Sequence, residues 1–307
     1  MKPRQADATL VLACLLWGMS FVVVKLGLQF ASPLTFAAIR FALAALVLAP
    51  FVRLERRFSR AELADGALLS LLLGIGFLTQ MAGLQWTTPS RSAFFVALSS
   101  VLAPAIAVVA LRERPRAALL AALALAALGV LFLTAPDRGG LNRGDALTLI
   151  TAVLYGGHIV VTGVVARRHD PLRLVWLEIA GTAVLAAAGA AIIEDPRVSW
   201  SPQFTAALAY TAIGATVITL LLQMKAQRYL SAARASVLFC SETLFAAITS
   251  WLVLGERLSP AQWLGGGLIL AGMMLAELKP SAISPQPSAA AVELSQPPND
   301  ISAPADS

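Results

Sequence analysis

Apolar runs long enough to cross a bilayer recur along the chain, and most charged residues lie in the short stretches between them. A spanning helix needs about 20 residues to cross roughly 30 Å of hydrocarbon. The chain has 307 residues, of which 58% are hydrophobic and 13% are charged, whereas a soluble domain is about 25% charged. The sequence therefore predicts a membrane protein, and runs of this length predict helices rather than barrel strands.

The predicted fold class is an all-α membrane protein with ten transmembrane helices. The helices are expected at 8–28, 33–52, 62–84, 90–111, 117–135, 144–166, 171–193, 203–224, 232–254 and 260–278. Pro33, Pro171 and Pro260 fall near helix starts, where the missing N–H costs nothing. Residues 279–307 are rich in Pro, Ser and Ala, which predicts a disordered tail.

The loops predict an orientation through their Lys and Arg residues, which gather on the cytoplasmic side of membranes. If residues 1–7 are a cytoplasmic N-terminus, most of these loop residues fall inside. The exceptions are Arg91, Arg138, Arg143, Arg197 and Arg257. We therefore expect both termini, including the tail, in the cytoplasm. Lys25, Arg91 and Arg234 lie near span ends and are expected to reach lipid headgroups.

The chain contains an internal repeat. When the sequence is aligned with itself at a shift of 143 residues (223 − 80), or near the N-terminus at a shift of 138 residues (145 − 7), polar and aromatic residues coincide. The pairs are Gln80 with Gln223, Arg91 with Arg234, Glu113 with Glu256, Asp7 with Asp145, Trp17 with Tyr155, and Arg40 with Glu178. The matches predict two five-helix repeats, at 8–136 and 142–278. Because five is odd, the second repeat enters the membrane from the opposite side, which is typical of alternating-access transporters.

The repeated segments LRERP and LGERL, with Glu113 and Glu256, each join two apolar runs. We interpret them as helix-end loops at the interface of the repeats, with a gate as the alternative.

Four stretches carry a resemblance to a known family: LLWGMSFVVVKLGL, IRFALAALVLAPF, GLQWTTPSRSAFFVALSSVLAP and LFCSETLFAAITSWLVLGERLSPAQWLGGGLILAGMML. They resemble EamA-type permeases of the drug/metabolite transporter superfamily over residues 8–278. The resemblance implies a ten-helix fold with inverted repeats that exports small metabolites or drugs, commonly across bacterial inner membranes. The family often has Glu-Pro in the ninth span, whereas here Thr243 follows Glu242. Ser100 likewise stands where the first repeat often has Pro.

Ionisable residues inside spans are costly and therefore suggest function. Glu242 lies at the middle of the ninth run, where it could exchange a proton or contact a substrate amine, or only bond a neighbouring helix. His158 belongs to the most polar helix face of the chain and could relay protons, or pack as a neutral side chain. That face consists of Thr148, Thr151, Tyr155, His158 and Thr162.

Gln80 and Gln223 suit a cavity wall or a helix–helix contact. Arg40 and Glu178 could pair with each other, contact the two ends of a zwitterion, or reach the membrane interface. Trp17 is either a wall or core packing. The predicted substrate-binding residues are Trp17, Arg40, Gln80, Tyr155, His158, Glu178, Gln223 and Glu242, with Glu242 and His158 as coupling residues.

The function expected from these features is secondary-active export of small metabolites, such as amino acids or amphipathic compounds, by alternating access. Efflux of cationic drugs is the alternative. An embedded enzyme is disfavoured, because the spans carry no HExxH, GxSxG or nucleotide-binding motif. A channel is disfavoured because it would keep a polar lining along its whole path and would not need inverted repeats. We expect no cofactor, no metal and no nucleic-acid partner, only a small-molecule substrate and the lipid bilayer. Glycines 265–267 and Gly272 could serve a neighbouring helix or a homodimer.

Overall fold

The computed structural model describes residues 3–52, 57–110, 117–133, 140–230 and 232–277. The first half forms α1 Pro3–Gly27, α2 Pro33–Leu48 with the short 3₁₀ helix η1 Ala49–Phe51, α3 Arg60–Gly83, α4 Pro89–Ala110 and α5 Ala117–Leu133. The second half forms α6 Arg143–Val165, α7 Pro171–Ile193, α8 Pro202–Ala209, the π-helix η3 Tyr210–Ile218, α9 Thr219–Gln227, α10 Ala232–Leu254 and α11 Pro260–Glu277. The elements α8, η3 and α9 follow one another without a break, so the described residues make ten long helices, as predicted.

Several helix starts follow directly from local chemistry. Proline is the first residue of α2, α7 and α11, where its fixed φ angle suits a helix and its missing N–H is not needed. Asp170 caps α7 by accepting hydrogen bonds from the amides of Leu172 and Arg173. Glu113 and the predicted tail at 279–307 lie outside the described residues.

Length and apolar composition suit the helices to a membrane. Among the described residues, seven helices are long and apolar enough to cross a bilayer, and α5, α10 and α11 contain shorter apolar stretches. The outer surface is apolar as well, with Leu46, Val109, Val184 and Ile192 all well exposed. Large exposed apolar areas are unusual in a soluble protein, and here they fit a surface that faces lipid.

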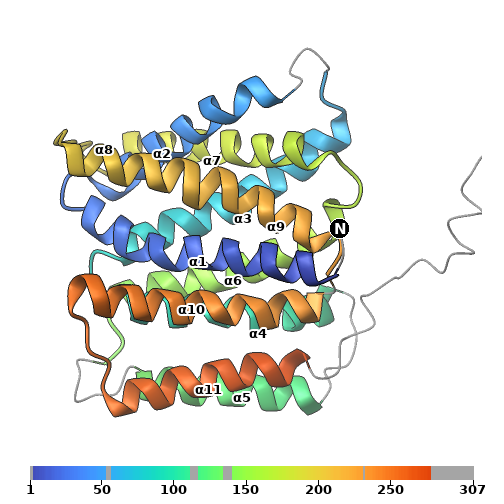
Figure 1. The fold of residues 1–307 in the computed structure, drawn as a ribbon, viewed down its shortest axis with the longest axis vertical. Coiled ribbons are helices and arrows are strands. Elements are labelled where there is room, and N and C mark those ends of the chain that lie inside the picture. The colour runs from blue at the N-terminus through green and yellow to red at the C-terminus, as the bar shows by residue number, and fades with distance from the viewer. Residues whose placement is uncertain (1–2, 53–56, 111–116, 134–139, 231, 278–307) are drawn as a thin grey trace, which may run out of the picture.

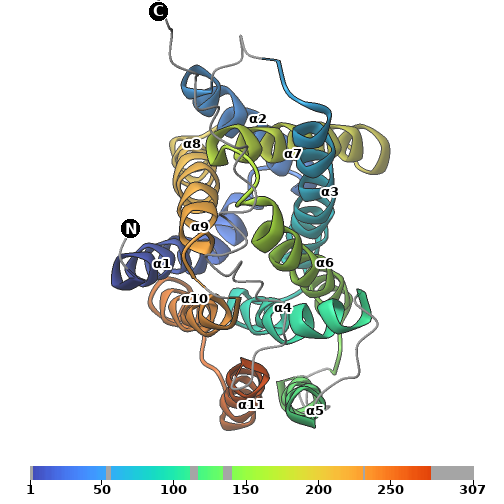
Figure 2. The ribbon, with the colours of Figure 1, turned by 90° about the vertical axis from the view of Figure 1, so that its right-hand side faces the viewer.

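The helices run roughly side by side in layers (Figure 1). In the view close to end-on, α5 and α11 form one edge, α2 and α7 form the other, and α1, α3, α6 and α9 surround the middle (Figure 2). The packing repeats the sequence symmetry, because α4 packs on α6 just as α10 packs on α1. These contacts, like those of α5 with α11 and α2 with α7, join the first repeat to the second. The repeats therefore interlock rather than forming two separate domains.

Glycines bring some of these helices into close contact. A Cβ atom on Gly129 would lie 2.6 Å from the carbonyl oxygen of Gly265, and one on Gly272 would lie 2.8 Å from that of Ala122. Both contacts join α5 to α11. The α11 glycines therefore serve a neighbouring helix at these points, while the homodimer stays a prediction.

Candidate functional site

A cavity lies in the middle of the bundle, between α1, α3, α4, α6, α9 and α10. It leaves about 80 Å³ for the centres of water-sized molecules, whereas one water needs about 10–15 Å³. Its walls include six of the eight predicted substrate-binding residues: Trp17, Gln80, Tyr155, His158, Gln223 and Glu242. The remaining two, Arg40 and Glu178, are not among the lining residues.

Glu242 faces this cavity from α10. Within the described part of the chain it has neither a hydrogen bond nor an ion pair through its carboxylate. A Cβ atom on Gly18 of α1 would lie 2.7 Å from the Glu242 carbonyl oxygen, so α1 and α10 are in close contact at this level. A carboxylate in a span without a protein partner is costly, and its position on a cavity wall leaves it available to a ligand or a proton.

Aromatic side chains line the same cavity as Glu242. Trp17 and Phe239 line the cavity with their ring centroids 6.3 Å apart, so Trp17 is a wall residue. Tyr155 donates a hydrogen bond from its hydroxyl to Oε1 of Gln80 at 3.1 Å. Its ring lies against Gly76, where a Cβ atom would be 2.5 Å from the Tyr155 ring. The cavity is therefore mostly apolar, with a few polar groups in fixed places.

His158 connects the cavity to a buried acid. Its Nε2 atom lies 2.6 Å from Oε1 of Glu178, which is fully buried on α7. The other carboxylate oxygen, Oε2, has no hydrogen-bond partner among the described residues. Thr162, one turn along α6, lies 3.5 Å from the same histidine nitrogen. Glu178 is thus linked to the cavity wall through His158.

Arg40 is buried on α2 and binds the π-helix η3. Its Nε donates to Oγ1 of Thr216 at 2.9 Å and its Nη2 donates to the carbonyl of Ala215 at 3.1 Å. The guanidinium also lies over the rings of Phe41 and Phe77, 5.3 Å and 4.8 Å from their centroids. Arg40 and Glu178 therefore have other partners than each other. The sequence missed this contact because η3 lies 176 residues away from Arg40.

The π-helix itself was also missed. Within η3 the hydroxyl of Thr216 donates to the carbonyl of Thr211, and the carbonyl of Ala215 accepts from both Arg40 and the indole of Trp17. π-Helical segments are rare and are frequent at functional sites. Gly214, which lies between Thr211 and Thr216, is the only sequence signal we find for it, and it is weak.

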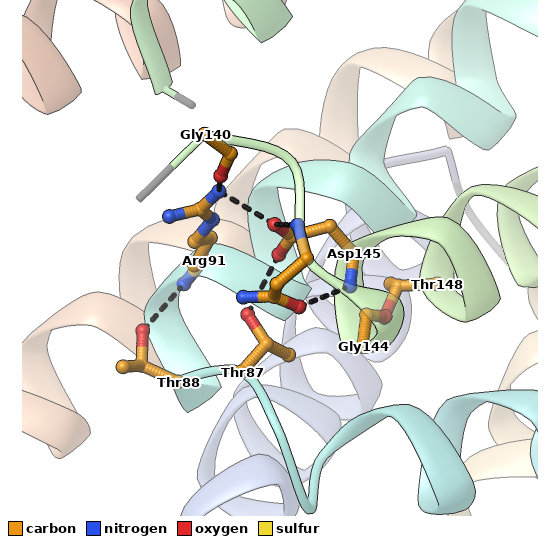
Figure 3. Close-up of polar contacts among 8 residues, drawn as sticks. Thr87, Thr88, Arg91, Gly140, Gly144, Asp145 and Thr148 are labelled. Atoms are coloured by element: carbon orange, nitrogen blue, oxygen red, sulfur yellow. Dashed lines mark hydrogen bonds and ion pairs between the residues drawn. The ribbon is translucent and has the colours of Figure 1, made fainter. Parts of the chain in front are cut away.

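Two charged residues expected at lipid headgroups bind protein groups instead. Arg91 is 7% exposed and pairs with Asp145 at 2.5 Å (Figure 3). Lys25 donates to the carbonyls of Leu84 and Thr87. Both correct the lipid-anchor expectation, because carbonyls and a carboxylate of the protein lie within reach of these side chains. The side chain of Arg234, the third residue of that expectation, lies outside the described part of the structure. The described residues contain no group of three His, Cys, Asp or Glu that could hold a metal ion.

Comparison with known proteins identifies the family. Residues 4–135 and 142–278 each match the EamA-like transporter family, and these two segments contain the two five-helix halves described above. The chain belongs to the EamA-like transporter family. This transporter is therefore a multi-pass membrane protein and not an enzyme, and its two repeats are family domains, as the resemblance implied.

Individual relatives agree with this assignment. The transporter is 29% identical over 279 residues to an "uncharacterized transporter" of Archaeoglobus fulgidus, over 91% of this chain and 88% of the relative. It is 26% identical over 297 residues to the "uncharacterized inner membrane transporter YicL" of Salmonella typhimurium, and this match covers 90% of this chain and 96% of the relative. A protein crystal structure with 17% sequence identity matches with a TM-score of 0.65, covering 89% of this chain and 98% of that one. The last match supports the fold alone.

Proposed function

We propose that this transporter exports small amphipathic molecules that carry an amine, by alternating access, and that Glu242 binds the amine. The observation that carries the proposal is the Glu242 carboxylate, which lines an aromatic cavity without a protein partner among the described residues. Trp17, Phe21 and Phe239 supply apolar contact, and an aromatic face attracts a cation within about 6 Å.

The charges on the cavity wall favour a cation over a zwitterion. The sequence alone placed both signs at the site, because Arg40 was a candidate for the carboxylate of an amino acid. In the structure Arg40 binds Thr216 and Ala215 and does not line the cavity. Amino acids therefore become the second candidate. They would require Phe77, which lines the cavity beside the Arg40 guanidinium, to move aside.

Exchange of the substrate for a proton is the coupling mechanism that a single acidic residue on the cavity wall supports. A single carboxylate holds either a proton or a cationic substrate, so that release of one favours binding of the other. His158, with Glu178 behind it, is a second proton-binding group at the same cavity. Inner-membrane location with both termini in the cytoplasm is part of the proposal; the loop Lys and Arg residues and the printed name of YicL support it.

Counterflow in proteoliposomes tests the proposal. Wild type, Glu242→Gln and Glu242→Asp would be compared with a labelled panel of hydrophobic amines and amino acids, with and without a pH gradient. We expect amines to move fastest, the gradient effect to vanish in Glu242→Gln, and Glu242→Asp to keep part of it. Asp195→Asn, an exposed acid in the α7–α8 loop, is the control.

Equal, gradient-independent flux in wild type and Glu242→Gln would contradict a coupling role for Glu242. Faster counterflow of amino acids than of amines would overturn the preference for cations.

A further inference from the structure

Arg40 is a buried cation without an acidic partner. Its side chain is almost fully buried on α2, and no carboxylate among the described residues forms an ion pair with it. Glu178, its mate in the sequence repeat, contacts His158 instead. The hydrogen bonds that Arg40 donates to Thr216 and Ala215 go to neutral groups. A buried charge is costly without a counter-charge, so this guanidinium keeps the capacity to bind an anion.

Two aromatic rings cover the guanidinium. Phe41 follows Arg40 on α2 and Phe77 comes from α3, and their ring centroids lie 5.3 Å and 4.8 Å from Cζ of Arg40. Phe41 is fully buried and is not one of the cavity-lining residues, whereas Phe77 lines the cavity. Phe77 therefore lies against the buried charge and also forms part of the cavity wall.

Neighbouring rings hold Phe77 in this position. Its ring lies edge-on to those of Phe41 and Tyr155, with centroid distances of 5.0 Å and 5.7 Å and interplanar angles of 73° and 62°. Tyr155 is fixed in turn by its hydrogen bond to Gln80. Edge-to-face pairs at these distances are favourable. The Phe77 ring would lose both contacts if it swung away, so Arg40 stays covered while the cavity keeps this shape.

We propose that Phe77 sets the charge preference of the cavity, because its ring keeps the Arg40 guanidinium away from a substrate carboxylate. With the ring in place, the acidic group on the wall is Glu242, which favours an amine. Without the ring, a guanidinium and a carboxylate would face the same cavity, and this pair suits the two ends of a zwitterion. The inference rests on the proposed function for the preference it explains, whereas the covering of Arg40 is independent of any substrate.

Chemical modification of Arg40 tests the cover without a substrate. Phenylglyoxal is a small, neutral reagent that modifies arginine, and mass spectrometry of the peptide that contains Arg40 would measure the modified fraction in proteoliposomes. Wild type, Phe77→Ala and Phe21→Ala would be compared. Phe21 lines the same cavity from α1 and is not one of the two rings against the guanidinium, so its replacement is a matched control. We expect faster modification of Arg40 in Phe77→Ala alone.

Counterflow of two matched compounds tests the preference itself. Phenylalanine and phenethylamine differ by one carboxylate. We expect Phe77→Ala to raise the counterflow of phenylalanine relative to phenethylamine by about tenfold, the factor that a hydrogen bond to a charged group contributes. Phe21→Ala should slow both compounds alike and leave their ratio unchanged. Adding Arg40→Met to Phe77→Ala should return the ratio to that of wild type.

Equal modification of Arg40 in wild type and Phe77→Ala would overturn the proposal. The same shift of the transport ratio in Phe77→Ala and Phe21→Ala would overturn it as well, because cavity size alone would then explain the result. If Phe77→Ala does not fold, Phe77→Leu leaves a smaller side chain without a ring over the guanidinium. Both readouts should then move in the same direction by a smaller factor, and unchanged readouts in that variant would equally count against the proposal.

Failure of the proposed function would look different. A wild type that already moves phenylalanine faster than phenethylamine would contradict the preference for amines. The modification of Arg40 would still decide, in the same preparations, whether Phe77 covers the guanidinium.

Discussion

At the scale of single residues, several cavity residues were predictable from the sequence because polar groups are costly in lipid. Glu242, His158 and Gln80 each interrupt an apolar run, and the structure brings all three to one cavity. Contacts between distant residues were not predictable in the same way. Nothing near Arg40 in the sequence indicates that its guanidinium binds Thr216, because that contact depends on how α2 packs against η3.

Gly18 offers a residue-scale prediction about the cavity wall. Its missing side chain lets α1 approach α10, since a Cβ atom there would lie 2.7 Å from the Glu242 carbonyl oxygen and 2.8 Å from the Ala246 amide nitrogen. Both atoms are backbone and cannot rotate away. We expect Gly18→Ala to lower the free energy of unfolding by about 1–3 kcal/mol, as overpacking does.

Thermal unfolding of the purified protein in detergent would measure the Gly18 effect. Gly163→Ala is the matched control, because α6 leaves open space around that position. Alanine favours a helix over glycine by up to about 1 kcal/mol, so the control should be neutral or slightly stabilising. A Gly18→Ala protein as stable as this control would refute the close contact between α1 and α10.

At the scale of elements, the ends of the helices were easier to predict than their internal geometry. Proline starts α2, α7 and α11 at the expected positions, because proline suits only the first turn. The run at 203–224 was predicted as one ordinary helix. It contains the π-helix η3 instead, where Arg40 and Trp17 both bind the Ala215 carbonyl, and no local propensity encodes partners from other helices.

Replacing Arg40 tests whether it positions η3 or binds substrate. Arg40→Met removes two hydrogen bonds from the guanidinium. Hydrogen bonds to charged groups are each worth about 1.5–3 kcal/mol, so the unfolding free energy should fall by at least that much. For an amine substrate, however, KM should change little, since Arg40 does not line the cavity.

Denaturant unfolding and initial transport rates would separate the two roles of Arg40. Thr216→Val removes the bond from Nε of Arg40 together with the hydroxyl's own bond to the Thr211 carbonyl, and it should reproduce part of the stability loss while leaving the bond from Nη2 of Arg40 to Ala215 in place. If Arg40→Met left stability unchanged and raised KM for an amino acid alone, Arg40 would be a substrate ligand after all.

At the scale of the whole molecule, the internal repeat was the most informative feature of the sequence. It predicted two five-helix units of opposite orientation, and the two family matches follow the same division. It did not predict which helices pack together, because the offsets compare positions and not contacts. The packing of α4 on α6 and α10 on α1 joins the repeats, and this cross-repeat pairing places polar residues from both around one cavity.

The orientation of the bundle is the last prediction, and α6 provides the test. Arg143 begins α6 and Arg168 follows its end, and both side chains are exposed, so the two positions lie at opposite ends of one 23-residue span. On a background in which both cysteines of the chain, Cys14 and Cys240, are replaced by alanine, an impermeant maleimide added to intact cells should label Arg143→Cys and not Arg168→Cys, because the loop charges predict a cytoplasmic Arg168. The reverse pattern would mean that the transporter has the opposite orientation in the membrane. Labelling of both positions would mean that α6 does not cross the membrane.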